Sequence, residues 1–162
     1  NRRVYDMSAH DDSLSGMGTT LTVLWEDEKE ILLGHIGDSR AYLLRSGQIT
    51  QVSEDHSMVA QMVRDGAITE EQAMVHPYRN VITQAVGTAT DGLDVYLKRL
   101  EKQRGDKYLV CSDGLYEYVN KEEMQKIMMH YSPEDAVELM IEKALEGGGK
   151  DNVTVLIAEV AL

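Results

Sequence analysis

Short apolar runs that end or begin at an aspartate in a polar turn are the feature that most constrains the fold of this chain. Asp38 and Asp113 each follow such a run, and Asp151 precedes one. The runs are rich in aliphatic and β-branched residues, which favours strands. A carboxylate at a strand end is held by a rigid backbone and still faces a cleft, as a hard divalent cation with oxygen ligands requires. The three aspartates therefore predict a metal site.

The positions of Asp113 after a strand and of Asp151 before a strand add a condition on the fold. Asp113 and Asp151 can converge only if the strand before the first and the strand after the second are neighbours in space. Considered singly, each is better interpreted as an ordinary turn residue, because Asp-Gly and Asp-Asn are common turn formers. A shared site therefore depends on the rest of the chain.

Strand patterns follow one another closely in the N-terminal part of the chain. They are residues 19–25, 31–36, 41–45 and 48–52. Four successive short strands predict an antiparallel meander. Residues 94–97 and 107–111 return to strand character.

Helical spacing takes over between residues 55 and 85 and again before a last strand at residues 153–157. Thr69 begins a capping-box pattern, which predicts a short helix in the first of these segments. Asn120 and Ser132 are predicted to cap two amphipathic helices. We therefore expect a helical insertion between strands and a helical pair before the last strand.

The net charge of the chain and the length of its apolar runs indicate which partners and which cellular location to expect. The chain has 16 Lys and Arg against 28 Asp and Glu, a formal net charge of -12. Nucleic acid would be repelled, so no nucleic-acid partner is expected. The apolar runs are far shorter than the roughly 20 residues that cross a bilayer, and no signal peptide is visible. We expect no membrane partner and a cytoplasmic location, with which a single cysteine, Cys111, is consistent.

Six motifs occur in order along the chain. They are Gly16–Thr20, Gly37–Tyr42, Glu54–Ser57, Arg79–Gly87, Cys111–Leu115 and Gly148–Thr154. This ordered set resembles the metal-dependent protein phosphatases, the PPM or type 2C family, and is most similar to the bacterial serine/threonine phosphatases. The resemblance covers essentially all of residues 1–162. It implies an α+β fold: an antiparallel β-sandwich flanked by helices in α-β-β-α layers.

The resemblance also implies an activity, the hydrolysis of phosphoserine and phosphothreonine in the targets of a cognate serine/threonine kinase. A hydroxide held between two Mn²⁺ or Mg²⁺ ions would attack the phosphorus, so no side chain is expected to be a covalent catalyst. Asp113 and Asp151 match ligands of the second core metal, and Asp38 matches a carboxylate that holds a possible third metal with Asp113. Residues 55–85 match a flap beside the substrate cleft, where His76 is the candidate substrate-binding residue.

The early motifs of the family pattern have no counterpart here. Gly16-Met17-Gly18 is similar to the family's loop with a bridging aspartate, but Ser15 stands where the aspartate would be required. We therefore expect residues 1–162 to be a single phosphatase-like domain that lacks its N-terminal third, so that the sandwich is incomplete at the N-terminus. Such a fragment is expected to be inactive alone, to bind manganese weakly, and to self-associate, swap strands or be marginally stable. The alternative is a non-catalytic phosphatase-like module that binds metals or partners.

Other catalytic chemistries fit the residues less well. A cysteine-phosphatase loop starting at Cys111 would need arginine where Glu117 stands. Gly37 to Ala41 approximates a serine-hydrolase elbow, but the elbow leads into a helix and the following residues favour a strand. The five histidines show no zinc-site spacing. Cys111 is therefore interpreted as a small buried strand residue, and His56 as a cap or flap contact.

Overall fold

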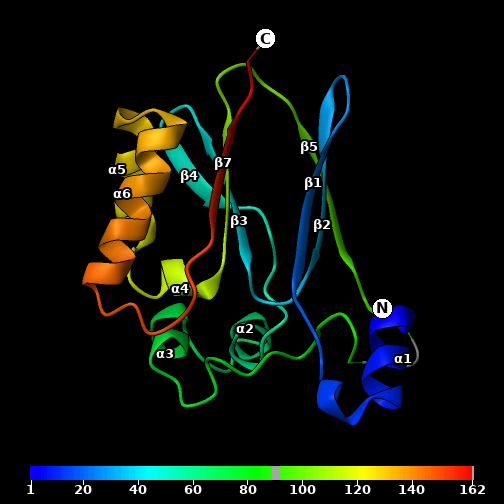
Figure 1. Cartoon of the computed structure of the whole chain (residues 1–162). Coiled ribbons are helices and arrows are strands. Elements are labelled where there is room, and N and C mark those ends of the chain that lie inside the picture. The colour runs from blue at the N-terminus through cyan, green and yellow to red at the C-terminus, as the bar shows by residue number, and fades with distance from the viewer. Residues whose placement is uncertain (89–91, 162) are drawn as a thin grey trace. The chain divides into compact units, whose positions relative to one another are not determined.

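The computed structural model describes residues 1–88 and 92–161 and divides the chain into two compact units (Figure 1). The first unit comprises residues 1–23, 34–38 and 54–97. The second comprises residues 24–33, 39–53 and 98–162. Both units are therefore built from segments that are far apart in the sequence.

A four-stranded antiparallel sheet is the centre of the second unit, with the order β4-β3-β6-β7. Its strands are β3 (Arg40–Arg45), β4 (Gln48–Gln51), β6 (Lys107–Cys111) and β7 (Val155–Glu159). Leu109 of β6 lies opposite Tyr42 of β3 on one side and Ile157 of β7 on the other. The strand predicted at residues 107–111 is confirmed.

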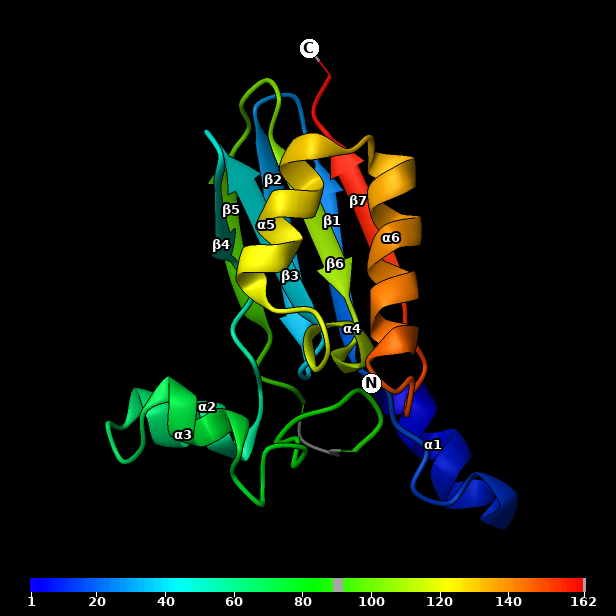
Figure 2. The ribbon, with the colours of Figure 1, turned by 90° about the vertical axis from the view of Figure 1, so that its left-hand side faces the viewer.

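Helices α5 (Lys121–His130) and α6 (Pro133–Glu146) cover one face of this sheet (Figure 2). Their starts agree with the capping prediction, because the side chain of Asn120 accepts from Glu123 N–H and that of Ser132 accepts from Asp135 N–H. Buried side chains from both helices, the sheet and the connection between β6 and α5 make one apolar core: Tyr42, Leu44, Ile49, Leu109, Cys111, Leu115, Val119, Met124, Ile127, Met128, Ala136, Met140 and Ala144. Cys111 is a buried core residue, as expected.

The first unit has less apolar burial. It contains α1 (Arg2–His10), the 3-10 turn η1 (Asp12–Leu14), α2 (Met58–Arg64) and α3 (Glu70–Met74). Helix α3 begins at the predicted capping box, in which Thr69 and Gln72 exchange side-chain and backbone hydrogen bonds. Among its described residues, the buried apolar side chains are Ile36, Val59 and Ala85, and the buried polar ones are His35, Asp55 and Ser57.

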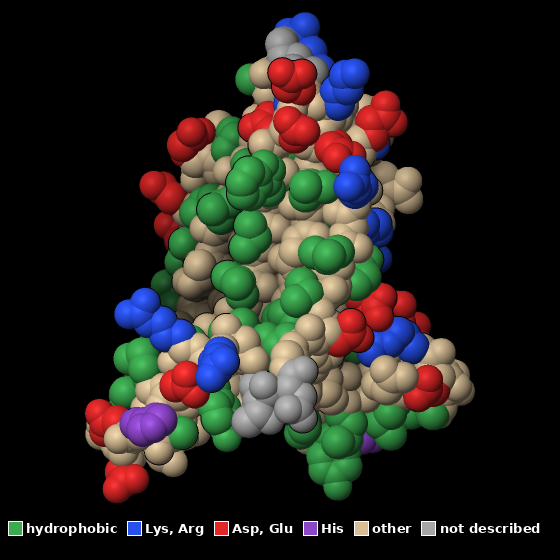
Figure 3. All heavy atoms as spheres, turned by 90° about the vertical axis from the view of Figure 1, so that its right-hand side faces the viewer, with side chains coloured by type: hydrophobic (Ala, Val, Ile, Leu, Met, Phe, Trp, Pro, Cys, Tyr) green, Lys and Arg blue, Asp and Glu red, His purple; other side chains and the backbone are tan. Residues whose placement is uncertain are grey.

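A three-stranded sheet has the order β1-β2-β5. Its strands are β1 (Leu21–Glu26), β2 (Glu30–Ile36) and β5 (Tyr96–Glu101), and each takes residues from both units. Leu21 and Val23 of β1 and Leu97 of β5 are 53%, 42% and 76% exposed. Green side chains gathered on the face shown in Figure 3 illustrate this apolar exposure.

The prediction of a single four-stranded meander is wrong. The chain changes sheets after β2, so that β1 and β2 belong to one sheet and β3 and β4 to the other. The change occurs at Gly37, whose φ of +106° lies in a region that favours glycine. The strand predicted at residues 94–97 is also displaced, because β5 begins only at Tyr96 and continues to Glu101.

Candidate functional site

Asp113 and Asp151 lie on neighbouring connections of the second unit, the Asp113 loop (residues 112–120, with one short helical turn) after β6 and the Asp151 loop (residues 147–154) before β7. Cys111, the last residue of β6, pairs with Val155, the first residue of β7, in the antiparallel ladder. The chain that leads into Asp113 therefore lies beside the chain that follows Asp151. The condition that these two strand ends be neighbours is confirmed.

Ser112 ties the two loops together through both its backbone and its side chain. Its N–H donates to the carbonyl of Thr154 over 3.1 Å, and its hydroxyl donates to the carbonyl of Asn152 over 3.1 Å. The N–H of Thr154 donates back to the Ser112 hydroxyl over 3.0 Å. A Cβ atom at Gly114 would lie 2.5 Å from the same Asn152 carbonyl oxygen, so the close approach requires glycine.

The two carboxylates differ in exposure. Asp113 is half-buried at the start of the one-turn helix α4 (Asp113–Tyr116), where its Oδ1 accepts from Gly114 N–H over 2.9 Å. Asp151 is exposed, and its Oδ1 accepts from Asn152 N–H over 2.7 Å. Two carboxylates on loops that are tied together provide the oxygen donors that Mn²⁺ and Mg²⁺ take, so these residues fit a divalent ion.

Across residues 1–88 and 92–161, no group of three or more His, Cys, Asp or Glu side chains lies close enough to hold a metal ion. Divalent cations of this kind take six or more oxygen ligands, from protein, substrate and water together. The assignment of Asp113 and Asp151 as metal ligands stays a prediction.

Asp38 belongs to the first unit and follows a turn that is held by two histidines. The N–H of Gly37 donates to His56 Nδ1 over 3.1 Å. The carbonyl of Gly37 accepts from His35 Nε2 over 2.9 Å and from the N–H of His56 over 2.7 Å. The contact of His56 with the backbone agrees with its interpretation as a cap or flap residue. His35 was not predicted to have a role, although a histidine in an otherwise aliphatic strand was a visible signal.

Burial lowers the pKa of both histidines. For His35 the loss of hydration is the main cause, and the nearby His56 ring adds to it. For His56 the loss of hydration again comes first, followed by the positive charge of Arg64. The neutral imidazole is favoured at both positions, which suits rings that hydrogen-bond a backbone peptide.

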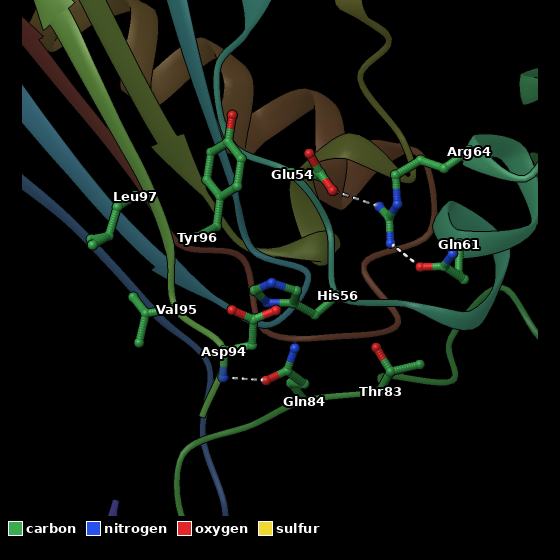
Figure 4. Close-up of a pocket in the computed structure, with 10 residues that line it drawn as sticks. All are labelled: Glu54, His56, Gln61, Arg64, Thr83, Gln84, Asp94, Val95, Tyr96 and Leu97. Atoms are coloured by element: carbon green, nitrogen blue, oxygen red, sulfur yellow. Dashed lines mark hydrogen bonds and ion pairs between the residues drawn. The ribbon is translucent and has the colours of Figure 1, made fainter. Parts of the chain in front are cut away.

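A cavity of about 340 Å³ lies in the first unit, beside α2 and the start of β5 (Figure 4). Arg64 crosses its wall, with Nη1 3.2 Å from Glu54 Oε1 and Nη2 donating to Gln61 Oε1 over 2.8 Å. Asp94 lies beside the His56 ring in Figure 4. Two carboxylates outnumber the one guanidinium among the lining residues, so the charge of this cavity is unfavourable for a phosphate group. Sequence reasoning did not find this cavity.

His76 lies at the end of α3, outside the lining of that cavity. It is half-buried, and its Nδ1 accepts from Tyr78 N–H over 3.2 Å. The centroids of the His76 and Tyr78 rings are 5.5 Å apart. These contacts orient the ring locally. Its candidate role toward substrate stays a prediction.

In the described part of the chain, no helix has the length and apolarity needed to cross a membrane.

Comparison with known proteins gives consistent matches along the chain. The family described as protein phosphatase 2C matches residues 2–145. The serine/threonine protein phosphatase PstP of Mycobacterium tuberculosis is 42% identical over 147 residues, which cover 91% of this chain and 28% of PstP. The serine/threonine phosphatase stp of Listeria monocytogenes is 36% identical over 160 residues, which cover 98% of this chain and 63% of that protein.

A solved structure supports the same relationship. The crystal structure of the catalytic domain of PstP in complex with two manganese ions matches with a TM-score of 0.86 at 37% identity, over 97% of this chain and 65% of that chain. This match confirms the predicted α+β fold class with antiparallel sheets flanked by helices. The chain spans less than two thirds of the length of both relatives and of the solved catalytic domain. On the family match over residues 2–145 and these identities, the chain belongs to the protein phosphatase 2C family.

Proposed function

We propose that this chain is part of a metal-dependent protein serine/threonine phosphatase that hydrolyses phosphoserine and phosphothreonine. The observation that carries the proposal is the β6-β7 pairing, which holds the loops of Asp113 and Asp151 side by side. Family membership supports it, as do the names of the relatives. The substrates would be proteins that a cognate serine/threonine kinase has phosphorylated.

The aspartates would act as metal ligands. Asp113 and Asp151 would hold a core ion, and Asp38 would help to hold a third ion with Asp113. Bound Mn²⁺ or Mg²⁺ would supply an activated water and offset the charge of the phosphoryl oxygens. Ser112 would hold the Asp113 and Asp151 loops together through its hydrogen bonds. His76 would bind substrate from the flap.

Asp113→Asn in the longest natural protein that contains this chain tests the proposal. Removing a carboxylate charge from a metal site should lower Mn²⁺-dependent hydrolysis of p-nitrophenyl phosphate by about 100-fold or more, since metal ions contribute several kcal/mol to such barriers. Mn²⁺ binding measured by calorimetry should weaken in parallel, with an unchanged circular dichroism spectrum.

Glu117→Gln is the matched control for Asp113→Asn. Glu117 is exposed just after α4, so this variant loses the same charge nearby and should keep full activity. Activity of Asp113→Asn within about twofold of the unmodified protein would contradict the ligand assignment.

A non-catalytic phosphatase-like module is the second candidate function. The observation that favours it is that residues 1–88 and 92–161 bring together no group of three or more possible metal ligands. We infer that the 162-residue chain by itself binds Mn²⁺ weakly and has no phosphatase activity. Robust Mn²⁺-dependent turnover by the purified chain would contradict this inference and would favour catalysis without further segments.

Self-association of the 162-residue chain is a further part of the proposal. The exposed apolar side chains Leu21, Val23 and Leu97 support it, because an uncovered sheet face tends to be buried in contacts between chains. Light scattering of the purified chain should give a mass above the monomer. A monomer at all concentrations would contradict this part alone.

A further inference from the structure

We propose that His35 and His56 are positioning residues for Asp38, because together they set the orientation of the peptide that joins Gly37 to Asp38. The inference rests on the proposed function in one respect, the role of Asp38 as a metal ligand. The carbonyl of Gly37 belongs to that peptide, and it accepts from both His35 Nε2 and the backbone N–H of His56. The N–H of Gly37 is held at the same time by His56 Nδ1.

The hydrogen bonds define the tautomer of each ring. A carbonyl oxygen can only accept, so Nε2 of His35 carries a hydrogen. Its Nδ1, 2.9 Å from Thr22 Oγ1, then accepts from that hydroxyl. Nδ1 of His56 accepts from an N–H, so its hydrogen is on Nε2. Both nitrogens of His35 are therefore engaged with protein groups, which leaves neither for a metal ion.

The two rings are also packed as a unit. Their centroids are 5.4 Å apart with an interplanar angle of 17°, and His35 is only 1% exposed. Lowered pKa values of both rings, caused mainly by burial, support the neutral state that this arrangement needs. Stacking of the half-buried His56 ring on the buried His35 ring restricts the movement of the donors and the acceptor that face Gly37.

Gly37 itself needs such support. Its φ is +106°, and a Cβ atom there would collide with the side chain of Thr20. Glycine allows this turn but does not hold it, because glycine has the widest conformational freedom of any residue. The histidine contacts restrict that freedom at the residue immediately before Asp38.

Paired substitutions separate positioning from simple packing. His56→Leu removes the acceptor for Gly37 N–H, whereas His56→Asn keeps an acceptor at the δ position. His35→Leu removes the donor to Gly37 O, whereas His35→Gln keeps a donor at the ε position. Positioning predicts that Asn and Gln restore what Leu disrupts. A role in packing alone predicts that Leu is tolerated best.

Amide hydrogen exchange of the 162-residue chain, followed by NMR, is the first measurement. In the leucine variants, exchange at Gly37 and Asp38 should accelerate by about tenfold, the factor expected for one lost hydrogen bond. The amides of Ser112 and Leu115 in the second unit serve as the internal reference. Unchanged exchange at Gly37 in His56→Leu would overturn the proposal. If His35→Leu does not fold, the His56 pair carries the test.

Manganese dependence in the longest natural protein is the second measurement. The leucine variants should raise the Mn²⁺ concentration for half-maximal phosphatase activity by about tenfold, as is typical when support of a metal ligand is lost. Asp38→Ala is the reference variant. If it shifts the Mn²⁺ dependence but the leucine variants do not, the positioning inference fails while the proposed function stands. If Asp38→Ala has no effect either, the metal role of Asp38 in the proposed function fails, and with it the reason for positioning.

Discussion

The loop that carries Asp38 and the loop that carries Asp113 both follow a strand, yet they are held by different kinds of contact. The first depends on two histidines that bond a glycine peptide. The second depends on the β6-β7 ladder and on Ser112, which bonds the neighbouring loop. The same residue type at a strand end can therefore rest on a polar, titratable support or on regular sheet pairing.

The surroundings of the two loops extend this difference. In the second unit, Leu109, Leu115 and Met140 are fully buried in an apolar core. In the first, the described buried side chains are as often polar as apolar. The Asp113 loop should therefore be sensitive to packing changes, and the Asp38 loop to changes in hydrogen bonding and pH.

The largest effect is expected from Leu109→Ala. Leu109 is fully buried in the middle of the four-stranded sheet, so its truncation should lower the free energy of unfolding by about 2–5 kcal/mol. Urea denaturation monitored by circular dichroism measures this. Leu156→Ala on β7 is the matched control, because Leu156 is 53% exposed, and it should change stability by less than about 0.5 kcal/mol. Equal losses in both variants would argue against the apolar core as the support of this unit.

A smaller effect is expected from Gly114→Ala. The added methyl group would lie 2.5 Å from the carbonyl of Asn152, which should lower stability by about 1–3 kcal/mol and separate the loops of Asp113 and Asp151. Gly34→Ala is the control, since its Cβ would meet only Leu97 at an ordinary 3.7 Å. Thermal unfolding compares them. An unchanged midpoint for Gly114→Ala would mean that the two loops can move apart without cost.

The smallest effect is a pH dependence specific to the Asp38 loop. The pKa of His35 is lowered in the folded chain, chiefly by burial, so the unfolded chain binds protons more readily. The contribution of neutral His35 to the free energy of unfolding is therefore fully present above the pKa that the ring has in the unfolded chain. It is lost as the pH falls below that value, about 6.5. Since His35 is one nearly buried group, we expect a loss of about 1 kcal/mol or less between about pH 7.5 and pH 5.5.

Hydrogen exchange over that pH range checks the comparison directly, after correction for the intrinsic pH dependence of exchange. The protection of the Gly37 and Asp38 amides from exchange should decrease as the pH is lowered. The protection of the Ser112 amide should stay constant. His35→Gln, which does not titrate in this range, should reduce the pH dependence at Gly37. A parallel loss of protection in both loops would show that the two supports do not differ in the way described.

Local signals account for the part of the fold that was predicted. The capping residues Thr69, Asn120 and Ser132 bond the backbone a few positions along the chain, so their role can be recognised in a short window of sequence. The strand at residues 107–111 follows from its aliphatic composition in the same way. The pairing of its end with the strand after Asp151 was stated from the sequence only as a condition of convergence, and the structure meets that condition.

Other features could not be predicted, because they depend on residues far apart in the sequence. The change of sheet after β2 depends on which strands pair, and a run of strands with similar alternation does not specify its partners. The hydrogen bond from Gly37 N–H to His56 joins positions 19 residues apart, which only the folded chain brings together. The link from Ser112 to Asn152 likewise joins positions that are separated in sequence by α4, α5 and α6.

The amino-acid sequence by itself determined the helix starts, the strand-forming runs, the glycines at strained turns and the presence of aspartates at strand ends. These follow from backbone preference and side-chain chemistry within a few residues. Only the tertiary structure decided that Asp113 and Asp151 share neighbouring loops and that a pair of stacked histidines supports the turn before Asp38. The physical reason is that strand pairing and burial bring distant groups into contact. The Asp113 loop is held by the pairing of β6 with β7, and the Asp38 loop by hydrogen bonds from His35 and His56.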